Sequence, residues 1–160
     1  PYTTLFRSQR TYEALKERLP DNAPNILLGA EVLICDGMEQ LEGLGRLCRQ
    51  GTNELLLELP FYKWPNSVWE TIDCLNDRDD IQIVIAHADR YPPESIEKLI
   101  GEDIPLQLNV ECFKKPLRRK QYISWTEKGY VRYLGSDMHM LETGYKDWVK
   151  CRKILEKKAK

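Results

Sequence analysis

Five ionisable side chains stand at the ends of apolar runs, where a folded protein would bury them. They are Glu31 after ILLGA, Glu58 after LLL, His87 after IVIA, and Asp137 and His139 after YLGS. A buried carboxylate without a partner is costly, so each needs a hydrogen-bonding partner, a counter-charge or a cation. Taken singly, each position would more often have a structural role than a metal-binding one. Together they indicate one shared metal site, and mixed imidazole and carboxylate ligands suit Mn, Fe or Zn better than Ca or Mg.

Arg90 is a candidate phosphate ligand, because it follows His87 by three residues. A guanidinium at that distance from a metal ligand can hold a phosphate oxygen and stabilise charge at phosphorus. The alternative is a surface salt bridge from Arg90 to Asp89 or Glu94.

The elements that must position these residues follow from alternating apolar and amphipathic runs. Strands are predicted at 26–32, 54–59, 81–87, 106–110 and 131–135, and helices at 12–19, 67–76, 93–100, 118–128 and 142–156. A long, partly helical loop is predicted at 37–51. This alternation predicts an α/β fold with a parallel sheet. The candidate residues then lie at the carboxyl ends of strands, the edge at which such folds build active sites.

Composition excludes several classes of protein. The 160 residues carry 24 Lys and Arg against 25 Asp and Glu, a net charge of −1. This balance gives no general attraction to nucleic acid or to acidic membranes. No apolar run reaches the roughly 18–20 residues that span a bilayer, so we expect no membrane insertion. Five scattered cysteines without a C-x-x-C pair exclude a zinc ribbon and predict reduced thiols in the cytoplasm.

One apparent motif is rejected. Cys112 and Arg118 have the C-x5-R spacing of cysteine-dependent phosphatases, but the segment between them contains no glycine and includes Pro116. Such a segment cannot curl its backbone N–H groups around a phosphate. The basic cluster in this region is interpreted as a solvated face, or as a surface that attracts an acidic, phosphorylated substrate. It comprises Lys114, Lys115, Arg118, Arg119 and Lys120.

The two ends of the sequence differ from its middle. Residues 1–8 (PYTTLFRS) resemble the translation of a sequencing-library adapter. We interpret them as a cloning scar, excluded from the fold, and expect 9–160 to form one domain whose natural sequence continues upstream. The segment 146–160 is rich in Lys and Arg and predicts the solvated face of a last helix.

Five motifs resemble those of the polymerase-and-histidinol-phosphatase (PHP) metal hydrolases, in the same order. They are GAEV at 29–32, LLLELPF at 55–61, VIAHADRY at 84–91, LNV at 108–110 and GSDMH at 135–139. Within this family the chain looks most like the bacterial capsule-type protein tyrosine phosphatases. The resemblance implies a distorted, TIM-like α/β barrel, here incomplete at its N-terminus.

The resemblance also implies a mechanism. Two or three divalent metals, usually Mn²⁺, would be held by Glu31, Glu58, His87, Asp137 and His139, and Arg90 would hold the phosphate. A metal-bridged hydroxide would attack phosphorus without a covalent intermediate. The substrate would be phosphotyrosine on a bacterial tyrosine kinase that regulates capsular or exopolysaccharide synthesis.

Two departures from the family pattern change the metal binding and the substrate contacts that we expect. The family's opening H-x-H strand and its further Asp and His ligands have no counterpart here, so we expect weak metal binding and poor turnover. A second family arginine is absent, and Lys146 stands near its place as a possible point charge for substrate. Three alternatives stay open: a small-molecule phosphatase acting on a substrate such as histidinol phosphate, a non-catalytic relic that binds a partner, and a purely structural α/β domain.

Overall fold

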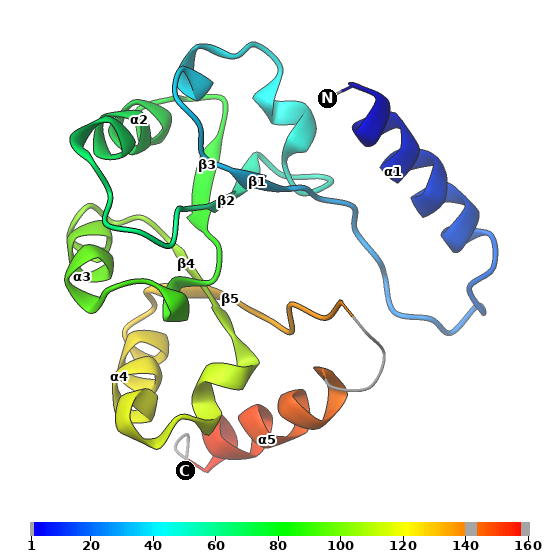
Figure 1. The fold of residues 1–160 in the computed structure, drawn as a ribbon. Helices are drawn as coiled ribbons and strands as arrows, with labels where there is room; N and C mark the ends of the chain where they lie inside the picture. Colours follow the sequence, from blue (N-terminus) through cyan, green and yellow to red (C-terminus); the bar gives the residue numbers. More distant parts are fainter. Residues whose placement is uncertain (1, 140–143, 158–160) are drawn as a thin grey trace.

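The fold is a five-stranded parallel sheet with five α-helices, seen in a computed structural model that describes residues 2–139 and 144–157 (Figure 1). The strands are β1 (Glu31–Leu33), β2 (Glu54–Glu58), β3 (Gln82–Ile85), β4 (Leu106–Asn109) and β5 (Val131–Gly135). The α-helices are α1 (Tyr2–Lys16), α2 (Asn66–Asn76), α3 (Pro93–Gly101), α4 (Pro116–Glu127) and α5 (Gly144–Glu156). Short 3-10 helices are η1 (Met38–Gln40), η2 (Leu44–Leu47), η3 (Ala88–Arg90) and η4 (Val110–Lys114). The predicted α/β class is confirmed.

The strands pair in the order in which they occur in the chain, β1-β2-β3-β4-β5, and every pair is parallel. Within the described residues β1 and β5 are therefore the two edges of an open sheet. The expected closure into a barrel is not shown.

The first strand is shorter than predicted. The run 26–32 was expected to be extended and paired, but β1 begins only at Glu31. Before that point the backbone bonds to the loop around η2: Ala30 N–H donates to Leu47 O, and Gln50 N–H donates to Leu28 O. The prediction that Glu31 ends a strand is therefore wrong. Glu31 opens β1, in register with Leu56 of β2.

The two faces of the sheet have different surroundings. Leu55, Leu57, Ile83 and Ile85 are fully buried, in the core cluster that also contains Ile72 and Leu75 of α2 and Ile96 and Leu99 of α3. The opposite face borders a cavity of about 500 Å³, lined by Leu56, Val84, Gln107 and Tyr133 together with Glu31, His87 and Asp137 among others. Helix α1 stands on this side of the sheet, away from α2 and α3.

Proline sets two helix starts. Pro93 and Pro116 occupy the first turns of α3 and α4, where a missing N–H costs nothing and the fixed φ favours the helix. As a result α4 begins at Pro116 rather than at the predicted Arg118. Helix α1 was predicted at 12–19, but it begins at Tyr2 and ends at Lys16, so it includes most of the adapter-like string.

A buried carboxylate, Glu54, lies at the amino end of β2 and is 4% exposed. Arg49 Nη2 donates to its Oε2 over 2.7 Å, and the Tyr133 hydroxyl donates to the same oxygen over 2.5 Å. Arg132 Nε donates to Oε1 over 3.0 Å. This Glu54 network satisfies both carboxylate oxygens, as a buried charge requires.

The Glu54 network predicts a loss of stability in acid. Burial favours the neutral carboxyl, but hydrogen bonds from Tyr133 and Arg49 and the charge of Arg132 outweigh it and hold the pKa of Glu54 below its usual 4.5. A depressed folded-state pKa stabilises the protein above pH 4.5, and this contribution is lost as the pH falls through the folded value. We therefore expect the urea midpoint to fall between about pH 5 and about pH 3, and to fall less steeply in Glu54→Gln. Equal slopes for the two proteins would contradict this.

The cysteines are not joined in disulfides, as the sequence predicts. All five cysteines are free, and burial raises the pKa of Cys112, which is fully buried. A thiol of this kind is a poor nucleophile, in agreement with the rejection of the C-x5-R motif. Within 2–139 and 144–157, no helix combines the length and the apolar character needed to cross a bilayer.

Candidate metal centre

Glu31, His87 and Asp137 form a cluster in which one ligand atom from each lies within 4.8 Å of the others. Glu31 opens β1, His87 follows β3 and Asp137 follows β5. A flat five-stranded sheet would separate its edge strands by about 19 Å, so the sheet must curl to bring Glu31 and Asp137 together. This curl forms the cavity on the concave face, with the cluster in its wall.

The orientation of His87 is set by its buried neighbours. Its Nδ1 lies 3.1 Å from Asn109 Oδ1, and its Nε2 lies 2.9 Å from Glu31 Oε1. Because an amide oxygen only accepts, Nδ1 carries the hydrogen in this contact. In the neutral ring the lone pair of Nε2 then faces the Glu31 carboxylate. Two acceptors in contact need a cation between or beside them, either a proton or a metal.

Asn109 is itself held in place by β4 and its neighbours. Gln107 Nε2 donates to Asn109 Oδ1 over 3.1 Å, and Gln107 Oε1 accepts from His87 N–H over 2.7 Å. The Asn109 backbone N–H donates to buried Asp89 over 2.9 Å. A Cβ at Gly135 of β5 would collide with Gln107 Nε2, so glycine is needed there for this network to form.

The backbone is left-handed at two residues of the cluster. His87 has φ of 51° and Asp137 has φ of 46°. Residues other than glycine rarely adopt this conformation, and when they do they often lie at functional sites. The strain at His87 turns the chain from β3 into η3, which carries Arg90.

Asp137 is bound on both carboxylate oxygens. Arg90 Nη2 donates to Oδ2, and His139 Nε2 lies 3.0 Å from Oδ1. Burial favours the neutral carboxyl, but the hydrogen bond from Arg90 and the charge of Arg90 outweigh it, and the pKa of Asp137 falls below its usual value. Asp137 is thus kept as a carboxylate, available to a cation.

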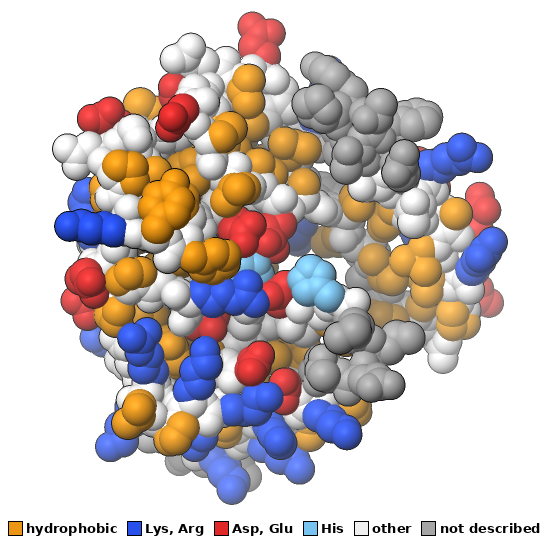
Figure 2. Space-filling view, viewed as in Figure 1, with side chains coloured by type: hydrophobic (Ala, Val, Ile, Leu, Met, Phe, Trp, Pro, Cys, Tyr) orange, Lys and Arg blue, Asp and Glu red, His pale blue; other side chains and the backbone are white. Residues whose placement is uncertain are grey.

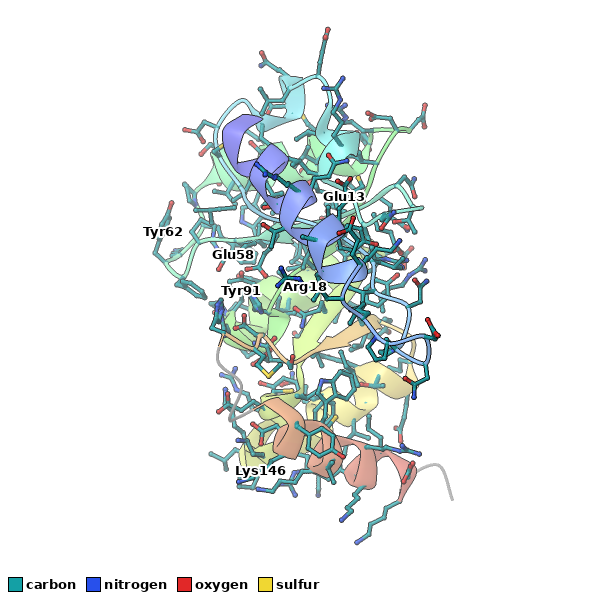
Figure 3. The ribbon with its side chains drawn as sticks, turned by 90° about the vertical axis from the view of Figure 1, so that its right-hand side faces the viewer. Glu13, Arg18, Glu58, Tyr62, Tyr91 and Lys146 are labelled. Atoms are coloured by element: carbon teal, nitrogen blue, oxygen red, sulfur yellow. The ribbon has the colours of Figure 1, made fainter. Side chains whose placement is uncertain are left out.

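Glu58, Lys146 and His139 were predicted site residues, but they lie outside the cluster of Glu31, His87 and Asp137. Glu58 ends β2, half-buried, and acts on the nearby Tyr91, whose pKa is raised to about 12 by burial and then by the charges of Glu58 and Glu31. Lys146 is exposed on α5. In Figure 3 Lys146 lies well below Glu58 and Tyr91, so the structure does not bring it to the centre.

His139 occupies the margin of the centre. Its side chain is 86% exposed, and its contact with Asp137 is its link to the cluster. Figure 2 shows the acidic, histidine and basic side chains gathered on one face, with hydrophobic side chains beside them.

The donor set fits a borderline divalent metal. Ligands about 2.1 Å from a metal and at right angles lie about 3 Å apart, close to the 2.9 Å between His87 Nε2 and Glu31 Oε1. One imidazole with two carboxylates suits Mn, Fe or Zn, and Asn109 supplies the outer hydrogen bond that metal-binding histidines usually have. Sequence reasoning assigned no role to Asn109 or Gln107. These two polar residues interrupt the apolar run LQLNV at 106–110, and that interruption could have indicated that they support the site.

No protein-family model, curated protein or solved structure matches this chain.

Proposed function

We propose that this chain carries the centre of a metal-dependent phosphatase of the PHP type, which hydrolyses phosphotyrosine in proteins with Mn²⁺ as the metal. The observation that supports it best is the convergence of Glu31, His87 and Asp137 at one edge of the cavity, with Arg90 bound to Asp137. Arginine next to a carboxylate–imidazole cluster is the combination needed to hold a phosphate beside a cation.

The topology supports the PHP proposal at the level of the fold. Consecutive strand order without reversal is the order of a β/α barrel, whereas doubly wound sheets reverse their order at a switch point. The curl of the sheet, which brings its two edge strands toward each other, also favours a barrel. We propose that the five strands form part of a distorted barrel wall.

In this proposal each residue of the site has a separate role. A bound divalent metal would supply Lewis-acid polarisation of the phosphate and a nucleophilic water at neutral pH. Glu31 and Asp137 provide negative charge for it, and Asn109 keeps the His87 Nε2 lone pair turned toward it. Arg90, 38% exposed, would exchange part of its contact with Asp137 for two phosphate oxygens.

A bacterial tyrosine kinase of capsular or exopolysaccharide synthesis is the proposed substrate protein. The basic cluster of η4 and α4 supports an acidic substrate only in part, because at least three of its members are already engaged: Lys115 Nζ lies 3.9 Å from Asp89 Oδ2. Lys114 Nζ donates to Asp147 over 2.8 Å, and Arg119 Nε donates to Phe113 O over 2.6 Å.

Manganese titration of the purified chain tests the proposal. The cluster of three ligands suffices for one metal rather than the pair that flanks a bridging nucleophile, so we expect weak Mn²⁺ binding and slow release of phosphate. A phosphotyrosine peptide should be hydrolysed faster than histidinol phosphate, and EDTA should abolish both activities.

Three results would contradict the proposal. Hydrolysis that survives EDTA would exclude the metal mechanism, and faster turnover of histidinol phosphate would favour the small-molecule phosphatase. Partner binding that survives EDTA, with no turnover at any Mn²⁺ concentration, would indicate the non-catalytic relic.

A further inference from the structure

Positive charge is concentrated at one end of the molecule. The segments 111–120 and 144–157 carry ten Lys and Arg against three Asp and Glu, although the whole chain has a net charge of −1. They form most of η4, the start of α4 and all of α5, and η4 and α5 are in contact. Figure 2 shows Lys and Arg side chains gathered in its lower part, where α4 and α5 lie in Figure 1. We call these two segments the basic end.

The charges at the start of α4 do not help this helix to form. Its first turn contains no acidic residue, and Arg118, Arg119 and Lys120 lie near its amino end. Cations at that end oppose the helix dipole, which favours negative charge there. Ion pairs such as that of Lys114 with Asp147, over 2.8 Å, use only part of the positive charge, because the basic end has more than three cations for each acid. The surplus is available to an anionic partner.

Large apolar side chains stand among these charges. Leu117, the second residue of α4, is 98% exposed, and Tyr145 and Trp148 of α5 are 77% and 40% exposed. Tyr145 and Trp148 are three residues apart, so they lie on the same side of the helix. A leucine with so little contact adds almost nothing to the hydrophobic free energy of folding. Apolar side chains ringed by Lys and Arg are, however, the pattern that enters the boundary between lipid headgroups and acyl chains.

We propose that the basic end attaches to the surface of membranes that contain anionic lipids, with Leu117 inserted between the headgroups. The negative potential of such a surface attracts Lys and Arg, and Tyr and Trp favour the interface because their rings combine an apolar body with a polar group. An acidic protein or a nucleic acid would use the charge but would leave Leu117 in water. The near-neutral charge of the whole chain conceals this property, because positive and negative side chains are segregated.

Vesicle sedimentation measures the attachment, and it does not depend on the proposed function because no residue of the metal cluster takes part. The full chain is mixed with vesicles of phosphatidylcholine alone, or of phosphatidylcholine and phosphatidylglycerol in equal parts. We expect binding to the phosphatidylglycerol vesicles to be at least about 10-fold tighter. In Arg118→Gln/Lys120→Gln we expect that affinity to fall by about 10- to 30-fold, because each cation near the surface contributes about fivefold.

Variants of Leu117 test the apolar contact. In Leu117→Ala the affinity for phosphatidylglycerol vesicles should fall by about 3- to 10-fold, with thermal unfolding unchanged because the side chain is 98% exposed. Leu117→Phe keeps an apolar tip and should bind within about twofold of the unaltered chain. The matched control, Arg10→Gln/Arg46→Gln, removes the same charge from α1 and η2, which lie in the upper part of Figure 1, away from α4 and α5. It should lose less than about twofold.

Three results would overturn the proposal. Equal binding to the two kinds of vesicle, or binding to neither, would exclude a surface for anionic lipid. An equal loss of affinity in the matched control would show that net charge, rather than the basic end, attracts the vesicles. If Leu117→Ala left vesicle binding unchanged while polyglutamate displaced the chain from the vesicles, the basic end would be a surface for an acidic protein instead.

Discussion

Replacing His87 by asparagine is expected to lower Mn²⁺ affinity by about 100-fold or more, because it removes the imidazole of the cluster. Asparagine is the sharper choice over alanine, since it tolerates the left-handed backbone at this position, where φ is 51°. Calorimetric titration with Mn²⁺ measures the loss, and circular dichroism checks that the fold is kept.

His139→Asn is the matched comparison, because these are the two histidines of the chain. The His139 side chain is 86% exposed, whereas that of His87 is 4% exposed and held at both ring nitrogens. We expect a loss of about 10-fold or less for His139→Asn. An equal or greater loss at His139 would contradict the geometry described for the centre.

Removing both cations of the Glu54 network should destabilise the fold by about 3 kcal/mol at neutral pH. In Arg49→Met/Arg132→Met the carboxylate stays buried, with the Tyr133 hydroxyl as its partner within the network. Adding Glu54→Gln should restore a large part of the lost stability, because the uncompensated charge is then gone. Urea unfolding of the three proteins measures the free energies.

Arg152→Met provides the control for a surface pair. Arg152 and Glu156 form an i,i+4 pair with side chains 77% and 59% exposed, and such pairs contribute less than about 1 kcal/mol. A double variant that loses no more than this control, or a triple variant less stable than the double, would show that the buried charge does not control stability.

The pattern of apolar residues predicted the strands well where one face or both faces of the strand are buried. The apolar runs ELLLEL and IQIVIAH became β2 and β3, because strands covered by helices must be apolar on that face. The strand at 26–32 was overestimated: most of the run does not pair, and its residues are half-buried or exposed, with Leu27 42% exposed. No local pattern shows that Ala30 and Leu28 bond to the loop around η2.

The candidate site was predicted in part. The placement of acids and histidines after apolar runs indicated Glu31, His87 and Asp137, which do converge. Lys146 could not be placed from its position in the sequence, since the direction of α5 depends on tertiary packing. The Asn109–Gln107 support depends on a cross-strand contact that Gly135 permits, and single-strand patterns do not reveal such contacts.

The consecutive order of the strands also bears on how the molecule is made. Each strand pairs with the one synthesised before it, so every step closes a short loop and the sheet can grow as the chain emerges from the ribosome. The candidate cluster is not assembled in the same way, because Glu31 comes from the first strand and Asp137 from beyond the last. Nascent chains that end before β5 would therefore hold much of the folded core yet lack a complete cluster, so metal binding at the proposed centre would have to follow completion of the sheet.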